Sequence, residues 1–262
     1  MNDHTTLLEI CTASVDDAIV AEQAGAQRIE LNTALPLGGL SPTPAMVKQT
    51  LQQISIPVIT MARPRESGFC YSDNEFTTLR DDARWMLDAG VHGIAFGVLT
   101  EAGEIDEARC RQMVETIGPD RDAVFHRAFD LVTDPVAALQ TLIECGVNRV
   151  MTSGGQVTAW QGRQQIKQMV DLAVDEVIEI LPAGGIRADH ASQLIQFTAV
   201  TQIHCGLGKA ALDRSYVPGK DGSAGNDQVN FYGMPPENPA QFRQSCQSSI
   251  QEMRRVLDQG QT

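Results

Sequence analysis

Residues 25–32, GAQRIELN, contain a pattern that recurs at residues 90–97 (GVHGIAFG), 146–153 (GVNRVMTS) and 199–206 (AVTQIHCG). Each copy begins with glycine or alanine, and a short apolar run with a period of two follows. Glycine tolerates the left-handed conformation that ends many helices, and a period of two is typical of a strand. Each copy therefore predicts a junction at which a helix ends and a strand begins.

A second set of strand-like runs alternates with these four copies. The runs are LLEIC at 7–11, IPVITMA at 56–62, DAVFHRAF at 122–129 and EVIEILPA at 176–183. Amphipathic helix patterns follow the strand runs, and four of them begin at suitable capping residues, Ser14, Asp73, Asp106 and Asp134. The helix patterns cover residues 14–24, 44–54, 73–89, 106–117, 134–145, 162–173 and 190–198.

Strands that alternate with helices predict a parallel sheet, because parallel neighbours need a crossover connection. We expect residues 1–262 to form a single α/β domain, a closed (β/α)8 TIM barrel, with an open doubly wound sheet as the alternative. The repeat favours the barrel, since alternate strands of a barrel occupy equivalent positions. A polar segment at about 213–236 predicts a long loop, and residues 240–258 predict a final helix.

The repeat also predicts which side chains point into the barrel. Aligning the copies places one residue of each toward the helices: Ile29, Ile94, Val150 and Ile203. Strand residues alternate between the two faces, so the next residue of each copy points inward: Glu30, Ala95, Met151 and His204. At the C-terminal rim, two residues further on, lie Asn32, Gly97, Ser153 and Gly206.

Ionisable side chains gather at the predicted C-terminal ends of the strands, where barrel enzymes place their active sites. Histidine and carboxylate groups there could transfer protons or bind a hard divalent cation, and arginines could hold a carboxylate or phosphate. The candidate catalytic residues are Glu9, Glu30, Arg63, His126, Arg127 and His204. The alternative is a purely structural role, in which Glu30 and Arg63 or Arg127 form a buried ion-pair layer.

Glycine-rich turns follow the last three predicted strands. The backbone N–H groups of such turns can bind an anion, and the loops after strands seven and eight are common phosphate sites in barrels. Short turns between strand and helix also require glycine for their own geometry, so both interpretations stay open. The predicted anion-binding residues are Arg65, Ser153, Gly154, Gly155, Gly184, Gly185, Gly206 and Gly208.

The composition favours a small-molecule or metal ligand. A net charge of -13 and a pI near 4.7 oppose binding to nucleic acid or to an anionic membrane surface. The sequence has neither a leader-like start nor an apolar stretch long enough to cross a membrane, which predicts a cytoplasmic protein. Its six cysteines lack any tight ligand spacing, so we expect free thiols.

Several motifs resemble, in the right order, those of the CutC family, described as copper homeostasis proteins. The motifs are LEICTAS at 8–14, AGAQRIEL at 24–31 followed by GGLSPT at 38–43, ARPRESGFCYSD at 62–73, GVLTEAGEID at 97–106, FHRAFD at 125–130, TSGG at 152–155 and AGGI at 183–186. The resemblance covers residues 7 to about 210. It implies a (β/α)8 barrel, a cytoplasmic homodimer and a role in handling Cu(I).

The resemblance further implies a thiol site for Cu(I) that begins with Cys11. The family places a second cysteine where this chain has Asn32, and an amide is a poor ligand for Cu(I). The candidate metal ligands are therefore Cys11, Cys70 and Cys205. Copper handling is the first hypothesis, and an enzyme acting on a small anionic, for example phosphorylated, substrate is the second. A structural or interaction protein is the third.

Overall fold

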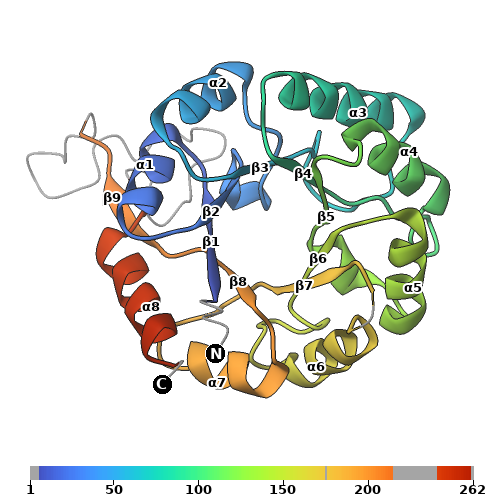
Figure 1. The fold of residues 1–262 in the computed structure, drawn as a ribbon. Helices are drawn as coiled ribbons and strands as arrows, with labels where there is room; N and C mark the ends of the chain where they lie inside the picture. The colour runs from blue at the N-terminus through green and yellow to red at the C-terminus, as the bar shows by residue number, and fades with distance from the viewer. Residues whose placement is uncertain (1–5, 175, 215–240, 261–262) are drawn as a thin grey trace, which may run out of the picture.

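The described residues form a closed barrel of parallel strands inside a ring of helices (Figure 1). The computed structural model describes residues 6–174, 176–214 and 241–260. The barrel strands are β1 (Leu7–Thr12), β2 (Arg28–Leu31), β3 (Val58–Met61), β4 (Gly93–Phe96), β5 (Asp122–Phe125), β6 (Arg149–Thr152), β7 (Glu179–Pro182) and β8 (Gln202–Cys205).

The strands follow chain order around the barrel. Each strand from β1 to β6 pairs in parallel with the next, and β8 pairs in parallel with β1. A parallel bridge between Ala183 and His204 joins the ends of β7 and β8. This bridge closes the sheet, so the predicted (β/α)8 barrel is confirmed and the open sheet was the wrong alternative.

The helices cover the outside of the barrel, and two short 3-10 helices lie at its mouth. The α-helices are α1 (Val15–Gln23), α2 (Pro44–Gln53), α3 (Asp73–Asp88), α4 (Glu107–Ile117), α5 (Pro135–Cys145), α6 (Arg163–Leu172), α7 (Ala191–Thr198) and α8 (Gln247–Gln259), and the 3-10 helices are η1 (Leu35–Leu37) and η2 (Arg127–Leu131). Within the described ranges, no helix has both the length and the apolar character that a membrane span requires.

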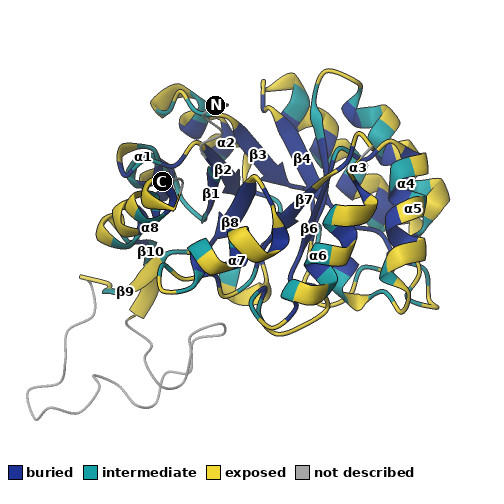
Figure 2. Cartoon of the chain, turned by 60° about the horizontal axis from the view of Figure 1, so that its bottom comes forward, coloured by how far each residue is buried: buried dark blue, intermediate teal, exposed yellow. Residues whose placement is uncertain are grey.

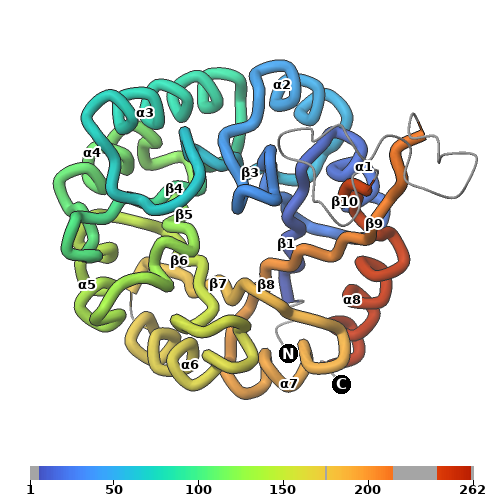
Figure 3. The backbone as a smooth tube through the Cα atoms, turned by 180° about the vertical axis from the view of Figure 1, so that it is seen from behind, coloured from blue at the N-terminus to red at the C-terminus, as the bar shows by residue number. Residues whose placement is uncertain are grey.

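The region after β8 differs from its prediction. An antiparallel ribbon of β9 (Gly208–Leu212) and β10 (Gln241–Ser245) comes before α8, so the last helix begins at Gln247 rather than near residue 240. The helix then packs against both α7 and α1 and fills the remaining place in the ring (Figure 3). Most of the predicted loop at 213–236 lies outside the described residues.

The repeated junctions have the backbone geometry that the pattern predicts. Gly25, Gly90 and Gly146 all have positive φ angles, of 99°, 100° and 83°. Ala199, which replaces glycine in the fourth copy, also has a positive φ, of 61°, and ends α7 in the left-handed conformation. The position therefore requires this conformation even where the side chain makes it less favourable.

Polar side chains fix the first turns of several helices. Ser14 caps α1 by accepting a hydrogen bond from the Asp17 N–H at 3.0 Å. The cap of α3 is Ser72 rather than the predicted Asp73, because Ser72 and Glu75 form a reciprocal capping box. Ser72 accepts from the Glu75 N–H at 3.2 Å, and Glu75 accepts from the Ser72 N–H at 2.8 Å.

The apolar residues form an outer layer and two inner clusters. Ile29, Ile94, Val150 and Ile203 are fully buried in the outer layer between strands and helices, as predicted, and Figure 2 shows most of the barrel-strand surface as buried. The inner clusters comprise Ile59, Met61, Ala95 and Val124, and Met151, Leu181 and Ala183. They fill the interior beside β3 to β7, whereas the interior beside β8, β1 and β2 is polar.

Candidate functional site

A pocket opens at the C-terminal ends of the barrel strands. Its volume is about 190 Å³. It brings together five of the six candidate catalytic residues and one candidate metal ligand, while Glu9 lies beneath it. The residues that line it are Cys11, Glu30, Asn32, Leu35, Gly38, Met61, Arg63, Phe69, His126, Arg127, Met151 and His204.

Three potential metal ligands meet on one side of this pocket. The ligand atoms of Cys11, Glu30 and His204 all lie within 4.8 Å of one another. The residues come from the adjacent strands β1, β2 and β8, and register places Cys11 directly opposite Glu30. Asn32 lies at their edge and donates from its amide to Glu30 Oε2, at 2.8 Å. We call Cys11, Glu30 and His204 the ligand cluster.

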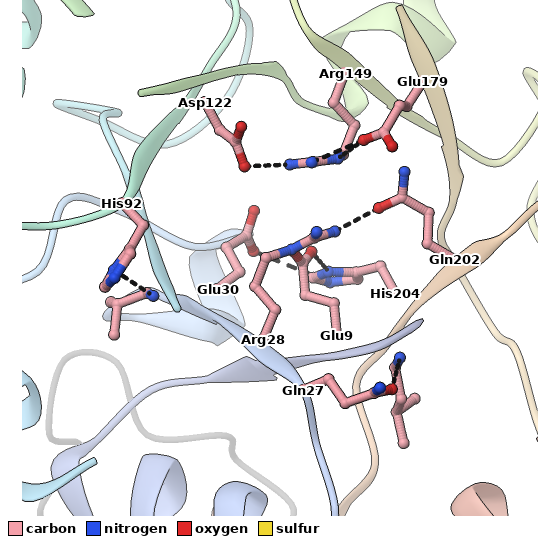
Figure 4. A network of polar contacts seen from close by, with 12 residues as sticks. Glu9, Gln27, Arg28, Glu30, His92, Asp122, Arg149, Glu179, Gln202 and His204 are labelled. Atoms are coloured by element: carbon pink, nitrogen blue, oxygen red, sulfur yellow. Dashed lines mark hydrogen bonds and ion pairs between the residues drawn. The ribbon is translucent and has the colours of Figure 1, made fainter. Parts of the chain in front are cut away.

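A buried carboxylate orients the histidine of this cluster. Glu9 Oε1 lies 2.7 Å from His204 Nδ1, which leaves Nε2 facing Glu30 Oε2 at 4.0 Å (Figure 4). Arg28 forms an ion pair with the other oxygen of Glu9 and donates to Gln202 Oε1 at 2.6 Å. Metal-binding histidines in proteins commonly have such a carboxylate on the second ring nitrogen.

The buried charges set the protonation of this side of the pocket. Burial alone would raise the pKa of Glu9, but the charge of Arg28 and the hydrogen bond from His204 outweigh it and lower that pKa to about 2. Burial opposes protonation of His204, yet its hydrogen bonds and the nearby carboxylates raise its pKa well above the usual value. Burial also raises the pKa of Cys11. In the metal-free protein, His204 is therefore an imidazolium and Cys11 a neutral thiol.

A second group of polar residues lines the pocket beside β3 and β5. His126 Nδ1 accepts a hydrogen bond from the Ala128 N–H at 3.1 Å, so the neutral ring carries its proton on Nε2. Burial and the charge of Arg63 lower the pKa of His126 to about 3, which keeps the ring neutral. The Phe69 ring contacts both residues, at 4.8 Å from the His126 ring centre and 5.0 Å from the Arg63 guanidinium carbon.

The described residues do not form the buried ion-pair layer that was the structural alternative for Glu30 and Arg63 or Arg127. Glu30 pairs with neither Arg63 nor Arg127. Arg63 instead donates to the carbonyls of Leu37 and Gly39, at 3.2 and 3.0 Å, and of Ser67, at 2.7 Å. The arginine therefore fixes the loops around η1 at the mouth of the pocket, and the carboxylate that pairs with a buried arginine is Glu9, with Arg28.

The first of the predicted anion-binding turns, residues 153–155, binds a carboxylate of the protein itself. The carboxylate of Asp130 accepts hydrogen bonds from the N–H groups of Ser153 and Gly155, at 2.9 and 3.1 Å, and from the Thr152 hydroxyl at 2.6 Å. Arg127 pairs with the same carboxylate at 2.8 Å and donates to Ser153 Oγ at 2.9 Å. The turn at Ser153, Gly154 and Gly155 therefore binds an internal anion.

Replacing Asp130 with alanine should remove the anion from the turn at residues 153–155. We expect the free energy of unfolding to fall by about 2 kcal/mol at neutral pH, since buried N–H and hydroxyl groups lose their acceptor. Inorganic phosphate should then restore part of the loss in the variant, because an external anion can replace the carboxylate. Urea unfolding with and without phosphate measures both effects, and an equal phosphate response in the parent protein would contradict the assignment.

Several other candidates lie away from the pocket. Arg65 pairs with Glu75 at 2.5 Å on the partly exposed side of α3. Gly184 and Gly185 adopt positive φ angles next to the side chains of Arg127 and Thr158, respectively. The Gly206 carbonyl accepts a hydrogen bond from Arg243, and Gly208 belongs to β9. None of these predicted anion-binding residues lines the pocket.

The predicted set of three thiols is not assembled. Cys70 is exposed, and Cys205 faces the outer hydrophobic layer because it follows His204 on β8. Only Cys11 reaches the pocket. His204 and Glu30, rather than Cys70 or Cys205, lie beside Cys11.

The polar layer beneath the pocket was not predicted from the sequence. Arg28 reaches Glu9 from the start of β2, and Arg149, at the start of β6, pairs with Asp122 at 3.0 Å and Glu179 at 2.8 Å (Figure 4). Both arginines occupy the same position of the repeat, two residues before Glu30 and Met151. Inward-facing residues recur at every second position of a strand. The alternation that placed Glu30 and Met151 inward therefore also places Arg28 and Arg149 inward.

Comparisons with known proteins agree with one another. The CutC family model matches residues 6–209. A CutC family protein from Treponema denticola is 42% identical over 252 residues, covering 95% of this chain and 97% of its own. The copper homeostasis protein cutC homolog of Homo sapiens is 39% identical over 199 residues, covering 76% of this chain and 72% of its own. The crystal structure of a CutC protein from Streptococcus agalactiae has a TM-score of 0.71 at 28% identity and covers 76% of this chain and 97% of its own.

Proposed function

The chain belongs to the CutC family, and we propose that it takes part in copper homeostasis by binding one copper ion at the ligand cluster. The observation that carries this proposal is the approach of Cys11, Glu30 and His204 to within 4.8 Å. Relatives named copper homeostasis proteins supply the identity of the metal. The cytoplasmic location and the homodimer that the resemblance implies stay predictions.

Two of the three donors, Cys11 and His204, suit Cu(I) in chemistry, and His204 is also held in a suitable orientation. A thiolate and an imidazole are ligands that Cu(I) accepts, and the thioether of Met61 lines the same pocket. Glu9 holds His204 by its Nδ1, so that Nε2 is the nitrogen available to the metal. Asn32, which occupies the family's second thiol position, instead positions the Glu30 carboxylate.

An anaerobic Cu(I) titration in competition with a chromogenic chelator tests this proposal. We expect one tight site per chain, and we expect Cys11→Ala and His204→Ala each to weaken it by about 100-fold or more, since even outer partners contribute about 10- to 100-fold. Cys70→Ala and Cys205→Ala are matched thiol controls that should bind copper as the parent protein does. A site that survives Cys11→Ala, or that disappears in Cys70→Ala, would refute the proposal.

A further inference from the structure

The part of the pocket wall formed by His126, Arg63 and Phe69 has no role in holding a copper ion. Its polar groups are N–H donors, which cannot coordinate a metal, and the Arg63 guanidinium is positively charged. Arg63 and His126 lie beyond the ends of β3 and β5, whereas the ligand cluster belongs to β8, β1 and β2. We call these three residues the donor wall.

Two donors on this wall are buried and lack a partner in the described part of the chain. They are Nε2 of His126 and Nε of Arg63. Both residues are more than nine-tenths buried, with relative exposures of 4% and 6%, and both line the pocket. A buried donor without an acceptor costs about 1–3 kcal/mol, so such groups point to a ligand.

The proton position on His126 is fixed by the fold. A backbone N–H can only donate, and that of Ala128 lies 3.1 Å from Nδ1. Nδ1 is therefore the acceptor, and the neutral ring presents Nε2–H as a donor. The Phe69 ring at 4.8 Å holds the imidazole in place. His126 lines the pocket, so an oxygen atom of a ligand that reaches Nε2 would receive an oriented hydrogen bond.

The charge and lining of the pocket define the class of ligand. The three oxygen acceptors that Arg63 already binds are carbonyls, which carry no net charge, so its positive charge favours an anion. Leu35, Met61, Phe69 and Met151 add an apolar lining that an inorganic anion would not use. A volume of about 190 Å³ holds a molecule of several heavy atoms rather than a single ion.

From these observations we propose that the pocket binds a small organic acid, whose carboxylate accepts hydrogen bonds from the donor wall while its carbon skeleton contacts the apolar lining. The occupant is a monocarboxylate of a few carbon atoms. It lies beside the ligand cluster and does not require copper. The site goes beyond copper binding, because its determinants are His126 and Arg63 rather than Cys11.

Lactate and pyruvate, titrated into the full chain after treatment with a metal chelator, are suitable probes. Calorimetry should give dissociation constants of about 1 mM or tighter for at least one of them. His126→Phe keeps a ring against Phe69 and removes the donor, so it should weaken binding at least about 10-fold, as expected for a hydrogen bond to a charged group. His190→Phe, at a histidine that contacts Trp160 outside the pocket, is the matched control and should bind normally.

A neutral probe and an inorganic probe test whether binding needs both the carboxylate and the carbon skeleton of the ligand. Lactamide, which lacks the carboxylate, should bind at least about 10-fold more weakly than lactate, and inorganic phosphate should bind more weakly than either acid. In the parent protein, the nuclear magnetic resonance signal of the His126 ring should shift when the acid is added, which tests the contact without any variant.

The proposal is overturned if neither acid binds, if His126→Phe binds them normally, or if phosphate binds more tightly than both. Cys11→Ala distinguishes this proposal from copper binding, because it should abolish the metal site and leave acid binding unchanged. Loss of acid binding in Cys11→Ala would therefore contradict a separate donor wall, whatever the outcome of the copper titration.

Discussion

Replacing Arg28 with leucine should lower the free energy of unfolding by about 3–5 kcal/mol, the range for breaking a buried ion pair from one side. The side chains of Arg28 and Glu9 are only 6% and 2% exposed. Without the guanidinium, the Glu9 carboxylate stays buried beside His204, and Gln202 loses a donor to its carbonyl oxygen. The variant should therefore unfold at a much lower urea concentration than the parent protein.

Arg65→Leu provides the matched control for this prediction. Arg65 also pairs with a glutamate, Glu75, but both side chains are 33% exposed. A pair of this kind contributes about 1 kcal/mol or less, because water screens it. If the two variants lose similar amounts of free energy of unfolding, the buried ion pair between Glu9 and Arg28 does not stabilise the fold more than an exposed pair does.

His126 should make the protein less stable as the pH falls from about 6.5 to 4.5. Burial and the charge of Arg63 lower the folded pKa of His126 to about 3, whereas an unfolded histidine has a pKa near 6.5. In this range the unfolded chain binds a proton that the folded chain does not. Stability is therefore complete above the unfolded pKa and falls by about 1.4 kcal/mol per pH unit below it, or about 3 kcal/mol in this interval.

His126→Phe isolates this effect, because the variant lacks the titrating group and keeps the other ionisable residues. His204 has a raised folded pKa, so it is protonated in both states below pH 6.5 and adds no slope there. Glu9 has a lowered pKa, of about 2, so its contribution is lost only below pH 4.5. Urea unfolding at several pH values should show the extra slope in the parent protein alone, and parallel curves would contradict a buried neutral His126.

The repeat was sufficient to predict the barrel and the direction of its strand residues. Glycine or alanine ends a helix at four places, and the period of two then separates Ile29 from Glu30 and Ile203 from His204. This local geometry depends on neighbouring residues, so it can be read from the sequence. The same rule could have identified Arg28, whose position was overlooked.

The partners of the charged residues could not be predicted in this way. Arg63 is long enough to reach either a carboxylate or the carbonyls of η1, and only the folded loop decides in favour of the carbonyls. Asp130 lies 23 residues before Ser153 in the sequence and still fills its turn. Similarly, Cys70 and Cys205 are chemically equivalent to Cys11, and only their placement in the fold separates them from the pocket.

If the proposed function is correct, copper should bind between Cys11, Glu30 and His204 at the mouth of the barrel. Crystals of the Cu(I)-loaded chain, measured at wavelengths on either side of the copper absorption edge, test it most directly. We expect one anomalous peak per chain within bonding distance of Cys11 Sγ and His204 Nε2, with Glu9 still hydrogen-bonded to Nδ1. Copper found only at the exposed Cys70 or at Cys246, with none in the pocket, would contradict copper binding at the ligand cluster.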